Sequence, residues 1–309
     1  MNHAALVPGD VVLSRERALE LVAGLCARAG VPCADAETPQ QPIMNAVVVL
    51  PAAGLVARVS ARDRRPHMLR ELRVAAWLRA NGIPAGEPAP DPPRPQAEVT
   101  DGLAVTWWGY LPHAHKADAA QVCAMAARIH RLTAPRGLLP AFDPFPVVRR
   151  AIEAASGMSE ADREQMRALA RDLEQQWISS RWPLYPPVVL HGDVHGTNVL
   201  ATSVGIRVVD LEDAAMGPWP WDLTVYLAGR EVGWIDEAEL ERALTAYGKD
   251  PRDEPGLDLL VQIRLLRMSA PVAAVTARAP TLAEQARLRI ASVTDPGLRE
   301  GWWWGEWAS

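Results

Sequence analysis

Three side chains between residues 191 and 210 have the types and spacing that phosphoryl transfer requires. Asp193 and Asn198 stand five residues apart in HGDVHGTN, and Asp210 follows in VVDLED. Asp193 is a candidate to accept the proton of an attacking hydroxyl, while Asn198 and Asp210 offer hard oxygen ligands that suit Mg²⁺ better than Zn²⁺. Magnesium would neutralise the β and γ phosphates of ATP before an alcohol oxygen approaches in line. The segment therefore predicts a proton acceptor beside a magnesium site.

The local sequence predicts a hairpin that positions these side chains. A short apolar run, PVVL, leads into the loop that contains Asp193. Two further apolar runs follow, one directly after Asn198 and one directly before Asp210, with a turn at Gly205 between them. Because the two strands of a hairpin run side by side, Asn198 and Asp210 should converge on one metal ion although twelve residues separate them.

This pattern resembles that of the aminoglycoside phosphotransferase and choline kinase family, whose members share the protein-kinase-like fold. The kinase catalytic loop has an asparagine five residues after its aspartate, and Asp193 and Asn198 keep that spacing. Asp210, Leu211 and Glu212 replace the kinase Asp-Phe-Gly triplet, which suits small-molecule kinases better than protein kinases. The resemblance implies an α+β, two-lobe fold with a small β-rich N-terminal lobe and a larger, mostly helical C-terminal lobe.

Two histidines in the segment permit another interpretation. His191 and His195 flank Asp193 in an HxDxH spacing that could hold a transition metal, so a metallohydrolase is an alternative class. That class explains neither Asn198 nor Asp210. We predict that His191 is a buried imidazole that braces the loop by hydrogen bonds, and that His195 either shapes the loop or contacts a phosphate.

Asp222, in GPWPWDL, lies between a turn-rich segment and an apolar helical pattern, which predicts a helix N-cap. In the resembling family an aspartate at this place supports the catalytic loop. Both interpretations are structural, so Asp222 is not placed among the catalytic residues.

The N-terminal part of the chain predicts a small sheet and a helix that would cover a nucleotide. Residues 47–50 and 55–59 are apolar, β-branched runs joined by PAAG, which predicts a β-hairpin. The next segment, residues 67–81, has apolar side chains close to helical spacing and ends at a glycine. These elements would form the β-rich lobe.

Arg58 in the second strand and Glu71 in the helix supply the charges with which protein kinases hold the α and β phosphates. The kinase residue is a lysine, and arginine is not an equivalent ligand, but members of the resembling family use arginine in a strand that reads like LVARV. The alternative is a surface arginine paired with any nearby acid. No GxGxxG precedes this hairpin, although Asn45 stands where the family often has an asparagine. ATP and GTP therefore remain alternatives.

Residues 105–112, VTWWGYLP, predict an apolar strand that runs into a hinge. In the resembling fold adenine hydrogen-bonds to the hinge backbone, so Trp108, Gly109 and Tyr110 are candidates for adenine contact. The tryptophans would serve equally as core residues. The expected division is residues 1–106 as the nucleotide-covering lobe, 107–112 as the hinge and 113–309 as the catalytic and acceptor-binding lobe.

The remainder of the chain predicts helices and leaves the acceptor undefined. The expected helices span residues 118–132, 159–177, 237–247, 257–275 and 282–290. Four acids could face a cationic ligand or belong to helix surfaces, namely Glu231, Asp236, Glu237 and Asp258. The tail GWWWGEW gathers Trp302, Trp303, Trp304 and Trp307. We expect the tail to pack onto the helices, the alternatives being a wall of the acceptor cleft or a dimer contact.

Composition excludes several classes of protein. The 309 residues are 49% hydrophobic, which gives ample core, and the length allows two lobes rather than two independent enzymes. A net charge of −5 without a basic stripe argues against nucleic-acid binding. We expect no membrane span and no signal peptide, because no apolar run is long enough. Three cysteines without a CxxC pair favour a reduced, cytoplasmic setting, while the oligomeric state is left open.

The sequence thus predicts an ATP- and Mg²⁺-dependent phosphotransferase that acts on a hydroxyl of a small molecule, such as an aminoglycoside or another antibiotic. Asp193 would accept the proton, Asn198 and Asp210 would hold magnesium, and Arg58 with Glu71 would steady the phosphates. One alternative is a catalytically silent kinase-fold binding module, which would account for the absent glycine-rich loop. The metallohydrolase is the other.

Overall fold

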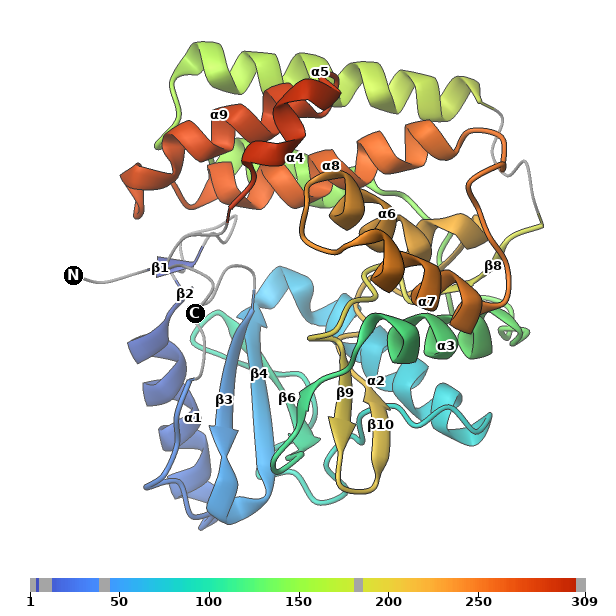
Figure 1. The fold of residues 1–309 in the computed structure, drawn as a ribbon. Coiled ribbons are helices and arrows are strands. Elements are labelled where there is room, and N and C mark those ends of the chain that lie inside the picture. Colours follow the sequence, from blue (N-terminus) through green and yellow to red (C-terminus); the bar gives the residue numbers. More distant parts are fainter. Residues whose placement is uncertain (1–3, 6–12, 39–44, 181–185, 304–309) are drawn as a thin grey trace. The chain divides into compact units, whose positions relative to one another are not determined.

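The computed structural model describes residues 4–5, 13–38, 45–180 and 186–303. They belong to two compact units, whose elements are labelled in Figure 1. Unit 1 draws on Met1–Ala117 and Thr197–Asp213, and unit 2 on Asp118–Gly196 and Ala214–Ser309. Unit 1 is mainly a β-sheet with helices and unit 2 is mainly helical, so the predicted α+β class is confirmed.

Unit 1 is built on a four-stranded antiparallel sheet in the order β3-β4-β6-β5. Its strands are β3 (Ala46–Leu50), β4 (Leu55–Ala61), β5 (Glu98–Thr100) and β6 (Leu103–Gly109). Gly54 closes the turn between β3 and β4 at a φ of 65°, a left-handed conformation that favours glycine. The predicted hairpin is confirmed.

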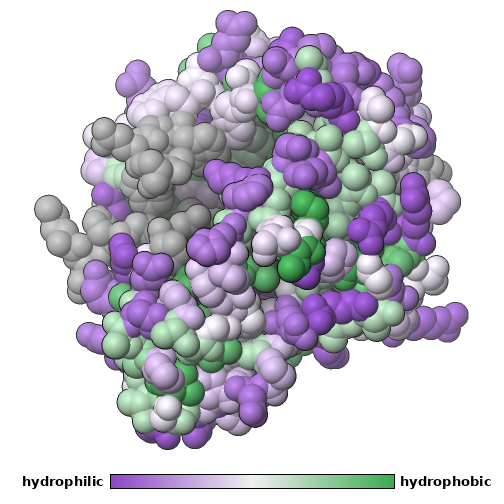
Figure 2. Space-filling model, turned by 60° about the horizontal axis from the view of Figure 1, so that its bottom comes forward, coloured by the Kyte–Doolittle hydropathy of each residue, from purple (hydrophilic) through white to green (hydrophobic). Residues whose placement is uncertain are grey.

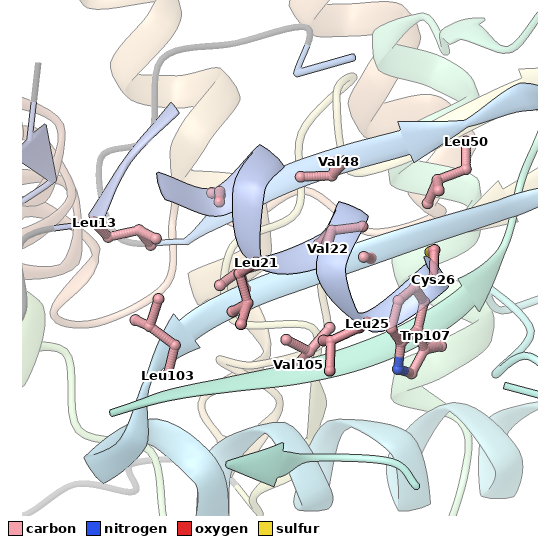
Figure 3. Close-up of a cluster of buried hydrophobic side chains, with 14 of the residues drawn as sticks. Leu13, Leu21, Val22, Leu25, Cys26, Val48, Leu50, Leu103, Val105 and Trp107 are labelled. Atoms are coloured by element: carbon pink, nitrogen blue, oxygen red, sulfur yellow. The ribbon is translucent and has the colours of Figure 1, made fainter. Parts of the chain in front are cut away.

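Helix α1 (Arg15–Ala29) packs on this sheet, although the sequence analysis did not predict it. Figure 3 shows Leu21, Val22 and Leu25 of the helix pointing toward strand residues that include Val105 and Trp107. All of these side chains are buried. Full burial of one such side chain contributes roughly 1.5–3 kcal/mol, so this cluster is a principal source of stability for the sheet.

Helix α2 (Arg65–Ala80) follows β4 and corresponds to the helix predicted over residues 67–81. The proline-rich segment after α2 then pairs with β10 (Gly205–Val208), because the Gly86 N–H donates to the Val208 carbonyl at 2.7 Å. The Val208 N–H donates in turn to the Pro84 carbonyl at 2.9 Å. This exchange ties β10 to the chain that leaves α2.

Strand β10 forms the predicted hairpin with β9 (Val199–Thr202), and β7 (His115–Lys116) adds a third strand on the other side of β9. Val199 pairs with Val208 at the open end of the hairpin. Gly205 begins the returning strand at a φ of 107°, which confirms the glycine-dependent turn.

Unit 2 consists mainly of helices (Figure 1). They are α3 (Ala119–His130), α4 (Phe145–Ala154), α5 (Glu160–Ser179), α6 (Thr224–Glu231), α7 (Glu237–Tyr247), α8 (Leu257–Ala274) and α9 (Ala283–Ser292). Asp118 and Ser159 cap α3 and α5 with capping boxes, as their positions predict. Helix α6 corresponds to the apolar helical pattern that was predicted after Asp222, and of these helices only α4 was not predicted.

A short antiparallel pair, β8 (Val188–Leu190) and β11 (Ala215–Gly217), lies within unit 2. Strand β8 is the apolar run that was predicted to lead into the catalytic loop. No helix in the described ranges is both long enough and apolar enough to cross a membrane.

The described part of the tryptophan-rich tail packs on unit 2. Trp302 is buried, donates from Nε1 to the Ser292 hydroxyl at 2.8 Å and lies edge-on to Trp234. The predicted packing is thus confirmed for Trp302, whereas Trp303 is 52% exposed. Trp304 and Trp307 lie outside the described residues.

Large apolar side chains at the described surface are scattered over different elements. The exposed ones are Val99, Ile178, Val204, Leu298 and Trp303. On the face that Figure 2 shows, hydrophobic residues are interspersed with hydrophilic ones. Single exposed apolar side chains are ordinary on a protein surface, so these positions need no partner to cover them.

We predict that Gly157→Ala destabilises unit 2. A Cβ atom at residue 157 would lie 2.3 Å from the backbone nitrogen of Ala277, so the backbone itself would have to move. The expected loss is about 1–3 kcal/mol of unfolding free energy, measured by urea titration. Gly229→Ala within α6 is the control, because its Cβ would meet only the Ile235 side chain at 3.9 Å. Equal stability of the two variants would contradict the prediction.

Candidate functional site

Arg58 and Glu71, the predicted phosphate-holding pair, contact each other in unit 1. The Arg58 guanidinium on β4 donates from Nη1 to Oε1 of Glu71 on α2, and both side chains are largely buried. Arg58 also donates from Nη2 to Oδ1 of Asp210 at 2.9 Å. Glu71 Oε1 accepts a further hydrogen bond from the Leu211 N–H at 3.1 Å. One ion-pair network therefore joins the strand, the helix and the segment that carries Asp210.

The charges of this network shift the pKa values of its members. Burial favours neutral Arg58, but the carboxylates of Asp210 and Glu71 outweigh burial and raise the pKa of Arg58 above its ordinary value. Burial, together with the charges of Asp210 and Glu212, raises the pKa of Glu71 to about 7 against the opposing effect of Arg58. Several carboxylates thus crowd one guanidinium, and a divalent cation at Asp210 would relieve their mutual repulsion.

Asn198 and Asp210 lie at the same end of the β9–β10 hairpin. Asn198 directly precedes β9, and its carbonyl accepts the N–H of Val209 at 2.9 Å. The Asp210 side chain is 39% exposed. Asp210 has a φ of 60°, a left-handed conformation that residues other than glycine rarely adopt. Such backbone strain persists where the surrounding structure imposes it, and it is frequent at functional sites.

These donors fit magnesium better than a transition metal. Mg²⁺ is usually held by one or two carboxylates together with substrate phosphates and water. Among the described residues, no group of three or more His, Cys, Asp or Glu side chains could hold a metal. Asn198 and Asp210 would instead share a metal with ligands from a bound phosphate compound.

Glu212 organises a second group of contacts in unit 1 that the sequence analysis did not anticipate. Its Oε2 accepts hydrogen bonds from Asn45 Nδ2 at 3.1 Å and from Arg64 Nη2 at 3.0 Å. Arg70 Nη2 donates to the Glu212 carbonyl at 2.9 Å. Asn45 therefore contacts the segment that follows Asp210. The available signal was the acidic run LED itself, directly after a predicted metal ligand.

The hinge candidates lie at and after the end of β6. The Gly109 N–H donates to the Glu87 carbonyl at 2.8 Å, and the Tyr110 N–H donates to the Gly54 carbonyl at 2.9 Å. Trp108 is buried in unit 1. The N–H groups of Gly109 and Tyr110 are thus both hydrogen-bonded to backbone carbonyls within unit 1.

Asp222 of unit 2 accepts hydrogen bonds from the backbone of the predicted catalytic loop. Its carboxylate accepts the N–H of His191 at 2.8 Å, the N–H of Gly192 at 3.0 Å, and a hydrogen bond with His130 Nε2 at 3.0 Å. Asp222 is fully buried and lies in the 3-10 turn before α6, so the predicted helix N-cap is wrong. The loop-supporting role that the resemblance implied matches these contacts.

Asp193, the candidate base, has a neighbouring side chain at each carboxylate oxygen. Its Oδ1 accepts from Arg264 Nη1 at 2.9 Å, and its Oδ2 lies 3.5 Å from His195 Nε2. Burial would raise the pKa of Asp193, but its contact with His195 and the charge of Arg264 outweigh burial and hold the pKa below its ordinary value. Asp193 therefore remains a carboxylate. The Asp193 N–H also reaches Nδ1 of buried His191 at 3.4 Å, as the bracing role predicts.

Arg264 is a site residue that the sequence analysis missed. It lies on α8 within LLVQIRLLRMSA, a mainly apolar helical run that also contains Arg267. An arginine inside such a run is a usable signal, because a buried guanidinium requires an acid or several carbonyls as partners. The identity of that partner, 71 residues away in the sequence, was not readable.

Most of the acids that were considered as contacts for a cationic ligand form ion pairs or cap a helix within unit 2. Glu231 pairs with Arg299, and Glu237 pairs with Arg230 at 3.0 Å. Asp236 caps α7 through its side chain. These contacts match the interpretation of the acids as helix-surface charges.

Solved structures show which fold this is. An amicoumacin kinase in complex with AMP-PNP, Ca²⁺ and Ami has a TM-score of 0.67 at 13% identity, covering 91% of this chain and 96% of that one. A microcompartment-associated aminopropanol kinase has a TM-score of 0.63 at 18% identity, covering 90% and 99%. A choline/ethanolamine kinase family protein from Mesorhizobium loti has 0.59 at 16%, covering 90% and 97%. The molecule thus has the kinase-like fold of small-molecule phosphotransferases.

The sequence places the chain within a family. The model described as "Phosphotransferase enzyme family" matches residues 45–260, and the chain belongs to that family. No curated protein sequence matches the chain significantly. The predicted resemblance to this family is confirmed.

We predict that Asp222→Asn destabilises unit 2, because it removes the charge that three donors share. The expected loss is about 1.5–3 kcal/mol of unfolding free energy in urea at pH 7. Asp236→Asn is the matched control, since asparagine caps a helix as well as aspartate does. A loss no larger than that of the control would refute the supporting role.

The difference in stability between wild type and Asp222→Asn should depend on pH. Burial favours neutral Asp222, but its interactions with His130 and His191 outweigh burial and lower its pKa. A lowered folded-state pKa stabilises the fold above the unfolded aspartate pKa of about 3.9, and this stabilisation is lost as the pH falls. The stability difference between wild type and Asp222→Asn should therefore shrink below about pH 4.

Proposed function

We propose that the protein transfers the γ-phosphoryl group of ATP to a hydroxyl of a small molecule in a Mg²⁺-dependent reaction. The observation that carries this proposal is the network in which Arg58 joins Glu71 to Asp210. Asp210 lies beside Asn198 at the end of one hairpin. A cation, two oxygen ligands and a buried acid that orients the cation are the parts that bind a nucleotide triphosphate with its metal.

On the nucleotide side, Asn198 and Asp210 would hold magnesium. When bound, the ion would neutralise charge on the β and γ phosphates. Arg58 would contact the phosphates, and Glu71 would keep its guanidinium in place. The carbonyls near Trp108, Gly109 and Tyr110 would meet the base. In this proposal residues 1–106 cover the nucleotide, 107–112 form the hinge and 113–309 carry the acceptor.

On the acceptor side, the substrate hydroxyl would donate a hydrogen bond to the Asp193 carboxylate. The hydroxyl oxygen forms a bond to the γ phosphorus as the bond from that phosphorus to the bridging oxygen of ADP breaks. The hydroxyl proton passes to Asp193, and ADP leaves. Because a carboxylate with a low pKa is a weak base, Asp193 acts mainly by orienting the hydroxyl, and it takes the proton late in the step.

Kinases of amino alcohols and of antibiotics share this fold, which supports a small polar acceptor with a hydroxyl group. An aminoglycoside or another antibiotic is one such class, and an amino alcohol is another. The decisive experiment incubates the protein with ATP, Mg²⁺ and a panel of hydroxylated antibiotics, amino alcohols and sugars. A mass gain of one phosphoryl group on one acceptor would support the proposal, and no ATP consumption with any acceptor would favour a silent binding module.

We expect Asp193→Asn to lower kcat by about 10²–10⁴-fold, because an amide cannot take the hydroxyl proton. Binding of a fluorescent ATP analogue should change little, since Asp193 is not assigned to the nucleotide. Asp250→Asn is the matched control, because Asp250 forms an aspartate–arginine pair with Arg252 on the surface of unit 2. Wild-type turnover in Asp193→Asn would remove Asp193 from the mechanism.

Asp210→Asn should raise the Mg²⁺ concentration needed for half-maximal activity by about tenfold or more, because it replaces a charged metal ligand by a neutral one. A magnesium titration at saturating ATP and acceptor measures this change. Asp101→Asn, which alters an exposed acid of unit 1, should leave the titration unchanged. An unaltered midpoint for Asp210→Asn would exclude Asp210 as a metal ligand.

A further inference from the structure

We propose that Arg264 is a positioning residue that anchors Oδ1 of Asp193 and thereby presents Oδ2 to the acceptor hydroxyl. The inference rests on the proposed role of Asp193 in phosphoryl transfer. It goes beyond that role because it assigns the orientation of the carboxylate to one side chain on a distant helix.

The guanidinium of Arg264 is held at each of its nitrogens. Nε donates to the Thr224 hydroxyl at 3.0 Å, and Nη1 donates to Asp193 Oδ1 at 2.9 Å. Nη2 lies 3.4 Å from the carbonyl oxygens of Gly192 and Trp221. Because the guanidinium is planar, these contacts fix its orientation. They therefore also fix the orientation of the Asp193 carboxylate that it binds.

The groups that hold Arg264 also hold the catalytic loop. The Trp221 ring lies under the guanidinium at 4.2 Å, and its Nε1 donates to the Gly192 carbonyl at 2.7 Å. The Thr224 hydroxyl donates to the Trp221 carbonyl at 2.6 Å. Arginine, tryptophan and the residue before Asp193 therefore form one connected assembly in unit 2.

The two members of the ion pair differ in exposure. The Arg264 side chain is 2% exposed, whereas that of Asp193 is 40% exposed. The cation thus lies inside the unit, and part of the carboxylate remains accessible. A buried cation carries a large desolvation cost, and an apolar side chain in α8 would avoid it. The arrangement is explained by its effect on the carboxylate rather than by a gain in stability.

Charged groups around Asp193 within unit 2 favour its ionised form. His195 lies beside Oδ2, Arg264 binds Oδ1, and Arg267 adds a second guanidinium charge from the same helix. If Arg264 is removed, Asp193 loses both its anchor and its nearest fixed positive charge. The reaction should then slow, and its acidic limb should move to higher pH.

The test compares Arg264→Met and Arg264→Lys with wild type, using the full-length protein, ATP, Mg²⁺ and the acceptor identified in the panel. We expect Arg264→Met to lower kcat by about 10²-fold, as expected for a misplaced catalytic group, with the KM for ATP changed less than about threefold. Arg264→Lys keeps the positive charge but lacks the planar set of guanidinium donors. It should therefore have a higher kcat than Arg264→Met but a lower kcat than wild type. The acidic limb of kcat/KM should move to higher pH in Arg264→Met and less in Arg264→Lys.

Arg289→Met is the matched control for the loss of a buried arginine. Arg289 lies on α9 of the same unit, donates to Gln285 at 3.2 Å and lies over the Trp302 ring at 4.8 Å. This control should lose stability without moving the acidic limb. The position of that limb does not depend on the fraction of folded protein, so it is informative even where Arg264→Met folds in low yield.

Three results would contradict the proposal, and they can be distinguished from one another. An unchanged kcat and an unmoved limb in Arg264→Met, with an active wild type, would overturn the positioning role alone. An inactive wild type with every acceptor would overturn the proposed function and this inference together. A rate loss in Arg264→Met that merely follows the folded fraction, as in Arg289→Met, would also overturn the positioning role.

Discussion

Neutralisation of buried charge is the constraint on which the rest of this structure depends. In unit 1 the guanidinium of Arg58 binds Glu71 and Asp210 together, and both it and Glu71 are largely removed from water. A buried ion without a partner costs several kcal/mol, at roughly the scale of a whole domain's net stability. Strand β4, helix α2 and the segment at Asp210 must therefore keep their mutual positions for the unit to fold.

The same constraint operates in unit 2, with a different arrangement. Arg264 binds Asp193, and Asp222 accepts two backbone N–H groups of the loop and a hydrogen bond with His130. Each aspartate thus has a fixed set of donors. In the proposed phosphoryl transfer such a loop would need little reorganisation as charge develops, which is the condition for electrostatic catalysis. The contacts of Asp222 stabilise the loop, whereas in our proposal the Arg264–Asp193 pair orients the carboxylate.

The acceptor side shows how such neutralisation limits specificity. Acids that would attract a cationic ligand, such as Glu231 and Glu237, are paired with arginines of the same unit. The net charge of −5 is summed over the whole chain, so it says little about the charge beside a bound acceptor. Recognition of the acceptor depends on the local arrangement of side chains, which varies freely on a fold shared by kinases of different substrates.

The sequence by itself determined most of the elements and the segment that carries the candidate site residues. Strands β3 and β4, helices α2, α3, α5, α7, α8 and α9, and the β9–β10 hairpin follow from local periodicity, caps and turn glycines, which act over a few residues. Asn198 and Asp210 could be paired in advance because a short hairpin brings them together. The Arg58–Glu71 pair was also predicted, since strand and helix are consecutive.

Only the tertiary structure decided the rest. Helix α1 was missed, and Asp222 proved to hold the loop rather than to cap a helix, because its partners come from other elements. Arg264 contacts Asp193 across 71 residues of sequence, and Glu212 gathers Asn45 and Arg64 from more than 140 residues away. Such contacts depend on the packing of whole elements, whose free energy is a sum over many side chains, so no local pattern encodes which partner a buried charge will find.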